Sequence, residues 1–270
     1  MRSILIATNL LIFIGLTLCA EQNITASIYA DNYFDFYVNG TLIKSDPLDF
    51  TPHNAVKFTF KVDTDYPRVY GVFAKDYASE SGYEYTGTNK PQLGDGALRI
   101  VLSDGTVSSN KWKCFTTSFG PTNESIASGC SSDKLTLCKI SSTTPPSNWS
   151  SFNFDDSSWS NAKEYTESEA GWGMKPSYSN GKCGTMTSPI DRSEKNPSSI
   201  TTLSDECLDP QSISWGSSKF IWMSDLNRDN SIVCRIKSDA KSTTNTIPSS
   251  LRYIKVEAIL FLLAIFLLLI

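Results

Sequence analysis

A strict alternation of apolar and polar residues in residues 55–63 constrains the fold more than any other feature of the chain. The segment reads AVKFTFKVD, in which Val56, Phe58, Phe60 and Val62 alternate with lysine, threonine and aspartate. Successive side chains of a β-strand point to opposite faces, so a period of two places one set in a core and the other in water. We therefore predict a strand here with one buried face.

Further strand signals lie on both sides of this segment. Residues 35–44 (DFYVNGTLIK) contain an Asn-Gly pair between two apolar runs, which predicts a β-hairpin. Residues 68–74 (RVYGVFA) are apolar on both faces, as in a central strand, and residues 97–103 (ALRIVLS) precede an Asp-Gly turn pair. Near the end, residues 219–223 and 231–237 flank a polar stretch, which predicts a final hairpin.

The remaining chain has the composition of loops. Residues 141–146 form a Ser/Thr/Pro connector, and residues 167–210 are rich in Gly, Ser, Pro and Asn. Such composition suits long surface loops more than a second core. No extended window has helical periodicity. We therefore expect a single all-β domain, residues 21–237, folded as a β-sandwich with long loops stapled by disulfides.

Both ends of the chain have the composition of targeting signals. Residues 1–20 combine Arg2 with an apolar stretch, which predicts a secretory signal peptide. Residues 258–270 (AILFLLAIFLLLI) are uninterrupted apolar sequence, preceded by a polar linker and spacer at residues 238–257. A small acceptor residue, a spacer and an apolar tail together indicate a glycosylphosphatidylinositol (GPI) attachment signal.

The spacing from this tail places the lipid acceptor near residues 242–245, and we take Ser242 as the candidate. Ser238 and Ser249 are alternatives. The tail can also be interpreted as a retained membrane anchor that includes Val256. In the GPI interpretation the protein has no membrane-spanning helix and lies at the cell surface, on the extracellular face of the plasma membrane.

The cysteines and glycosylation sequons agree with that location. Seven cysteines occur, and removal of Cys19 with the signal leaves an even number, which in a secreted chain predicts disulfides of open pairing. The six are Cys114, Cys130, Cys138, Cys183, Cys207 and Cys234. Four Asn-x-Ser/Thr sequons require an exposed, secreted loop. Their asparagines are Asn23, Asn39, Asn123 and Asn148.

Composition argues against several function classes. The formal net charge is -4, without the basic clusters that nucleic-acid binding needs. His53 is the single histidine, which argues against His-dependent catalysis. No phosphate-binding loop, dinucleotide fingerprint or Gly-x-Ser-x-Gly elbow occurs. We expect no enzymatic activity, although a glycosidase needs only a carboxylate pair, and Asp63, Asp65 and Asp76 are scattered carboxylates.

Three segments resemble the galactose-binding-like jelly-roll domains of discoidin-type proteins and glycosidase accessory modules. These are residues 30–40 (ADNYFDFYVNG), residues 96–113 (GALRIVLSDGTVSSNKWK) and residues 154–162 (FDDSSWSNA). The stretch from Cys183 to Cys207 departs from that pattern, so no site in it carries over. The resemblance implies a single jelly-roll β-sandwich, a scaffold often used to bind sugars and also used by purely structural proteins.

Several residues are candidates for ligand binding. Asp155 and Asp156 could bind sugar hydroxyls or calcium beside the indole of Trp159, or they could cap a turn while the indole fills the core. Aromatic rings on loops suit recognition, because they supply large contact area. Tyr83, Tyr85 and Trp172 are such residues, and Trp172 can also be interpreted as packing beneath the disulfide loops.

Asp225, Asn227 and Asp229 place oxygen side chains at alternate positions, as at the start of a calcium loop. Asn230 stands where an EF-hand requires glycine, and Ile236 stands where it requires glutamate. An EF-hand is therefore excluded, and a simpler calcium-binding turn or a solvated hairpin remains.

These observations lead to one expected function and two alternatives. We expect a GPI-anchored extracellular glycoprotein that acts as a non-catalytic binding module for carbohydrate, with glycans or surface glycoproteins as partners. No cofactor is required, although calcium is possible. The first alternative is a structural coat or cell-adhesion protein that binds other proteins. The second is a secreted glycoside hydrolase.

Overall fold

A computed structural model describes residues 21–47, 54–76, 82–84, 92–123, 138–170 and 202–239. Two large antiparallel sheets contain nearly all of the regular structure, so the expected all-β fold is confirmed. The helical elements in these ranges are short: α2 (Glu167–Ala170) and the 3-10 turn Pro210–Ser212. A small third sheet pairs β6 (Tyr83–Glu84) with β7 (Gln92–Leu93).

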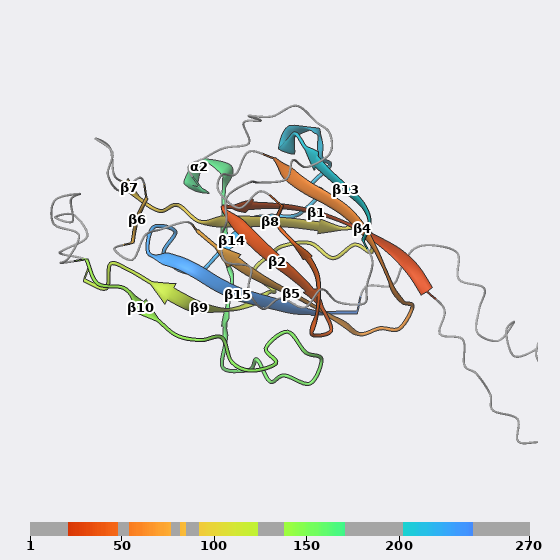
Figure 1. The fold of residues 1–270 in the computed structure, drawn as a ribbon, viewed down its shortest axis with the longest axis horizontal. Coiled ribbons are helices and arrows are strands. Elements are labelled where there is room, and N and C mark those ends of the chain that lie inside the picture. Colours follow the sequence, from red (N-terminus) through yellow and green to blue (C-terminus); the bar gives the residue numbers. More distant parts are fainter. Residues whose placement is uncertain are drawn as a thin grey trace, which may run out of the picture.

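The first large sheet has six strands, which form the upper part of the molecule in Figure 1. From edge to edge they are β12 (Lys163–Tyr165), β14 (Phe220–Trp222), β8 (Ala97–Leu102), β1 (Glu21–Asp31), β4 (Ala55–Asp63) and β13 (Thr202–Leu208).

The second large sheet has seven strands and lies below the first in the same view (Figure 1). Its main order is β10 (Ser141–Ser142), β9 (Lys113–Phe119), β15 (Asp229–Ser238), β5 (Arg68–Lys75), β2 (Tyr33–Val38) and β3 (Thr41–Ser45). The seventh strand, β11 (Ser160–Asn161), pairs with β9.

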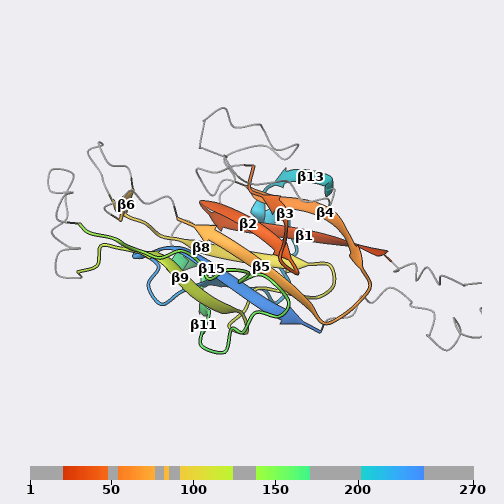
Figure 2. The same ribbon diagram turned by 60° about the horizontal axis from the view of Figure 1, so that its bottom comes forward.

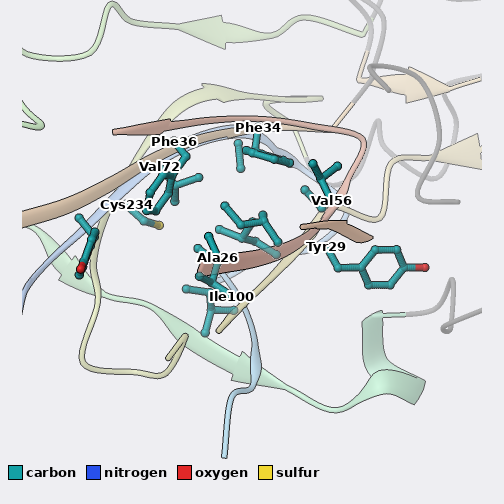
Figure 3. Packing of buried hydrophobic residues seen from close by; sticks show 14 of the residues in the cluster. Ala26, Tyr29, Phe34, Phe36, Val56, Val72, Ile100 and Cys234 are labelled. Atoms are coloured by element: carbon teal, nitrogen blue, oxygen red, sulfur yellow. The ribbon is translucent and has the colours of Figure 1, made fainter. Parts of the chain in front are cut away.

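The core lies between the two sheets and is built from the alternating positions of their strands. Val56, Phe58 and Phe60 of β4 are buried, whereas Lys57 and Thr59 between them are partly exposed, as the alternation predicted. Phe36 of the seven-stranded sheet packs against Phe58 and Phe60 with ring centroids 5.7 Å apart. Figure 3 shows this cluster of side chains from β1, β2, β4, β5, β8 and β15.

The two turn predictions from glycine pairs are confirmed. Asn39 and Gly40 have φ angles of 48° and 88° and join β2 to β3, as a two-residue hairpin turn requires. Gly105, with a φ of 92°, turns the chain after β8. Positive φ is accessible to glycine at little steric cost, which explains its place at both turns.

The predicted final hairpin is wrong. The strand Phe220–Trp222 belongs to the six-stranded sheet, where it pairs with β8 and β12. The strand Asp229–Ser238 belongs to the seven-stranded sheet, where it pairs with β5 and β9. The polar residues between them therefore form a crossover between the two layers.

The outer face of the seven-stranded sheet is covered by the chain between β10 and β11, residues 143–159, which runs below β9 and β15 in Figure 2. Trp149 and Trp159 are 9% and 6% exposed and pack against Val233. The rings of Trp159 and Phe115 stack at 5.6 Å. This segment therefore adds a third packed layer to the two sheets of the sandwich.

A disulfide joins Cys114 of β9 to Cys234 of β15 within the core. The two residues are direct partners in the strand register, with Cα atoms 4.1 Å apart. Cys138 is also part of a disulfide, and Cys207 is part of another. Cys130 and Cys183 lie outside the described residues.

Candidate functional site

A hollow lies on the outer face of the six-stranded sheet. Ile24, Ala26 and Ile28 of β1 face the interior, so Thr25 and Ser27 between them face outward. The central strands β1, β4 and β8 are direct neighbours in the sheet (Figure 1) and supply the floor. The floor residues are Thr25, Ser27, Lys57, Val101, Leu102 and Ser103.

The wall of this cavity is the chain that follows β13. It consists of Leu208, the last residue of β13, and of Ser212, Ile213 and Ser214, which border with the floor an open cavity of about 290 Å³. Asp209 holds this turn, since its side chain accepts a hydrogen bond of 2.8 Å from the Gln211 amide. The Ser212 hydroxyl also donates to the Asp209 carbonyl over 2.7 Å.

An aromatic anchor fixes the same segment to the sheet. Trp215 is 6% exposed, and its indole Nε1 donates to the Pro210 carbonyl over 2.8 Å. Its ring centroid lies 6.4 Å from that of Tyr29, which points away from the other labelled core side chains in Figure 3. The guanidinium of Arg99 lies 5.1 Å from the indole centroid. The cavity wall is thus held by packing as well as by hydrogen bonds.

The cavity combines hydroxyl groups, aliphatic carbons and one ammonium. Thr25 and Thr59 share a hydrogen bond of 2.9 Å between their hydroxyls, and Ser103 Oγ accepts from the Thr25 amide over 2.9 Å. Lys57 Nζ lies 3.3 Å from a carboxylate oxygen of Glu206. A few polar groups around apolar contacts are typical of a small-molecule site, and this volume is near the lower end of such sites, about 300 Å³.

The predicted carboxylate pair lies on the opposite side of the sandwich from this cavity, in the layer outside the seven-stranded sheet. Asp156 forms an ion pair with Arg235, which is 3% exposed at its side chain. Asp155 is exposed and accepts a hydrogen bond of 3.0 Å from the Ser157 amide, which lowers the pKa of its carboxyl. Both carboxylates therefore have partners within the protein.

The predicted aromatic residues are not assembled into a platform by the described part of the chain. Tyr83 is 6% exposed and packs against Cys138 and Leu93. Its burial raises the pKa of its hydroxyl. Tyr85 and Trp172 lie outside the described residues, as do Ser242, His53 and the two terminal signals. Trp112, Trp215 and Trp222 are buried in the core.

In the predicted calcium turn, the carboxylates of Asp225 and Asp229 accept hydrogen bonds from other groups of the same turn. Asp225 accepts hydrogen bonds from the Asn227 amide over 3.0 Å and from Arg228 Nε over 2.7 Å. Asp229 accepts from the Asp225 amide over 2.8 Å, and burial raises the pKa of its carboxyl. Within the described ranges, no group of three His, Cys, Asp or Glu residues is placed to hold a metal ion.

The four sequon asparagines, Asn23, Asn39, Asn123 and Asn148, are all exposed. Asn39 additionally accepts a hydrogen bond of 2.8 Å from the Val69 amide through its side-chain oxygen, which anchors the hairpin turn. Asn23 lies on β1, two residues before Thr25. The exposure that a glycan requires is therefore present at each sequon.

Sequence reasoning missed the cavity because its walls come from four separate segments of the chain. One local signal was available: Thr25 and Ser27 place hydroxyls on the outward face of a strand whose other face is apolar. None of the described helices is long and apolar enough to cross a membrane. Comparison with known protein families, curated proteins and solved structures finds no match.

Proposed function

We propose that the chain is a GPI-anchored cell-surface glycoprotein whose β-sandwich binds carbohydrate without catalysis. The observation that carries the proposal is the cavity on the outer face of the six-stranded sheet. A sugar ring has hydroxyls along its edge and carbon–hydrogen bonds on its faces. The cavity presents matching groups, namely serine and threonine hydroxyls beside Val101, Leu208 and Ile213.

The course of the chain supports the jelly-roll interpretation of the sandwich. After β1 in one sheet, β2 and β3 lie in the other, β4 returns, and β5, β8 and β9 continue the alternation. Strands that cross repeatedly between two layers are characteristic of jelly rolls and Greek-key sandwiches.

The surface location is supported by features of the described residues. Exposed sequons at four positions suit passage through the secretory pathway. A buried disulfide between neighbouring strands suits an oxidising compartment. Lipid attachment at Ser242 is supported by its spacing from the apolar tail and is part of the same proposal.

Binding is favoured over hydrolysis by the chemistry of the cavity. Glycosidases act through a pair of carboxyl groups that flank the scissile bond. The lining residues supply hydroxyls, aliphatic carbons and the Lys57 ammonium, which form hydrogen bonds and apolar contacts. Glu206 is not among the lining residues and forms an exposed ion pair with Lys57, with the two groups 3.3 Å apart.

Two measurements test the proposal on the full chain. Treatment of intact expressing cells with a phosphatidylinositol-specific phospholipase should release the protein into the medium. The released protein should then bind members of a glycan array, with and without calcium. Retention on cells whose lipid is of the cleavable type would overturn the anchor. An absence of array binding, both by the released protein and by protein whose asparagine-linked glycans have been removed, would overturn the carbohydrate ligand in favour of a coat or adhesion role.

A pair of variants locates the binding site. Ser214 lines the cavity, and Ser217, three residues later, is exposed but lies outside the lining. Ser214→Trp should fill the cavity and abolish glycan binding, whereas Ser217→Trp should bind as the unmodified protein does. Unfolding temperatures within about 2 °C of each other show that both variants are folded, since surface changes usually shift stability little. Equal binding by both variants would place the ligand elsewhere.

A further inference from the structure

We propose that the first sugar of the glycan on Asn23 lies in the cavity and closes it to other sugars. The inference rests on the proposed function in one respect, that the cavity accepts a sugar ring. Glycosylation at this one sequon would then determine whether the binding site is open.

The geometry of β1 brings the glycan to the cavity. Asn23, Thr25 and Ser27 occupy alternate positions of one strand, so they share its outward face. At a rise of about 3.3 Å per residue, the attachment point is about 7 Å from Thr25. Thr25 is at once the hydroxyl residue of this sequon and part of the cavity floor.

The side chains of the neighbouring strands leave room for a glycan on Asn23 beside the cavity. Asn23 is exposed and lies opposite Lys61 of β4. Lys61 is 52% exposed at its side chain and holds only a surface contact of 3.4 Å with Glu21. On the other side, the register of β8 with β1 begins at Ala26, and Ser103, directly after β8, continues the contact to Thr25 but not to Asn23. A sugar on Asn23 therefore lies beside exposed side chains on the same face of the sheet as the cavity.

The other sequons do not have this relationship to the cavity. Asn39 lies in the turn between β2 and β3 of the other sheet. Asn148 belongs to the layer outside that sheet, where its carbonyl accepts from the Ser151 amide over 2.9 Å. Asn123 follows the end of β9. Their glycans therefore provide controls that keep total glycosylation similar.

The chemistry of the first sugar fits the lining. Asparagine-linked glycans begin with N-acetylglucosamine, which has an acetyl methyl, an amide and ring hydroxyls. Ser27 and its partner Val101 are four residues, about 13 Å, along β1 from Asn23. A sugar that lies along the strand would meet the Ser27 hydroxyl and, through its methyl, the aliphatic groups of Val101 and Ile213. The covalent bond to Asn23 acts as a short tether, which gives the sugar an effective concentration at the cavity in the millimolar range. At that concentration even a weak site would be occupied.

The test compares full-length glycoprotein with Asn23→Gln and Asn39→Gln variants, using the glycan array and titration with free N-acetylglucosamine. We expect Asn23→Gln to bind about tenfold more tightly than the unmodified protein, as for a tethered sugar about tenfold above its Kd. Asn39→Gln should not change binding. A Thr25→Ser variant keeps both the sequon and the hydroxyl, and it should remain closed.

A second readout does not depend on added sugar. After enzymatic trimming to a single N-acetylglucosamine, nuclear Overhauser contacts should join its acetyl protons to Val101 or Ile213, and Ser214→Trp should remove them. Equal binding by all variants, or an unoccupied Asn23 in mass spectra, would overturn the closure. If these contacts are present but no variant binds added glycan, the closure stands and the proposed binding function fails.

Discussion

Arg235, in the middle of β15, forms an ion pair with Asp156, which lies 79 residues earlier in the chain. The same guanidinium donates to the Ser151 carbonyl over 2.8 Å and to the Phe154 carbonyl over 3.2 Å. One buried cation therefore fixes the layer that carries Trp149 and Trp159 on the outer face of the seven-stranded sheet.

Removing the negative charge from this pair should destabilise the protein. Asp156→Asn leaves a buried guanidinium without its counter-charge, and we expect a loss of about 2 kcal/mol in the free energy of unfolding, in the range for hydrogen bonds to charged groups. Asp155→Asn is the matched control, because asparagine still accepts from the Ser157 amide, and it should change stability by less than about 0.5 kcal/mol. Denaturant unfolding measures both, and equal effects would contradict the importance of the pair.

The buried hydroxyl of Tyr70 should make the stability of the protein sensitive to alkaline pH. The Tyr70 hydroxyl donates to Asp104 over 2.5 Å, and burial together with this carboxylate raises the pKa of Tyr70. A raised pKa means that the neutral form is favoured in the folded state. The contribution of Tyr70 to the free energy of unfolding is therefore complete below about pH 10, and it is lost as the pH rises further.

Unfolding measured from neutral pH to about pH 11 checks this expectation. The unmodified protein should lose stability across the upper part of the range, and Tyr70→Phe should lose less because one of the titrating groups is absent. Tyr165, whose pKa burial raises to about 12, remains in both proteins. Parallel pH profiles would show that Tyr70 does not contribute to the alkaline loss.

The Cys114–Cys234 disulfide should contribute strongly to stability. Its residues are 120 positions apart, and closing a loop of that length restricts the unfolded chain by about 4–5 kcal/mol in the entropic account. Replacing both cysteines with alanine should lower the free energy of unfolding by that amount. Because the two residues are at most 1% exposed, mild reductant should leave the bond intact in the folded protein. Rapid reduction without unfolding would contradict the buried position.

The indole of Trp149 packs directly against Gly71, which has no side chain. A Cβ atom at Gly71 would lie 3.0 Å from Trp149 Cζ3, so Gly71→Val should displace the indole. We expect a loss of about 1–3 kcal/mol from overpacking and a change in the near-ultraviolet circular dichroism of tryptophan. Gly105→Ala is the contrast, since its Cβ would meet nothing within 4 Å and its φ of 92° alone opposes the change. It should cost about 1 kcal/mol and leave the tryptophan signal unchanged.

Local features of the fold could be predicted from the sequence because local physics determines them. The alternation in β4 reports a strand with one face in the core, and the predicted bounds, Ala55–Asp63, agree with the observed strand. The Asn39-Gly40 turn was equally visible, because few residue pairs adopt two consecutive positive φ angles.

Features that depend on distant partners could not be predicted in this way. The pattern of β14 and β15 reports two strands and a turn, but it contains no information about which sheet each strand joins. The cavity likewise needs Thr25, Lys57 and Ser214 to meet, and pairings across β1, β4 and β13 bring them together. Trp149 and Trp159 cover a sheet that the composition of their own segment does not reveal.

The place of β15 has a consequence for how the protein is made. The last described strand in the chain lies between β5 and β9, inside the seven-stranded sheet. Until residue 238 has emerged from the ribosome, those two strands present unpaired edges of the kind that aggregate or recruit chaperones. The seven-stranded sheet can therefore close only after β15 has been made, and a chain truncated before β15 should aggregate or bind chaperones instead of folding.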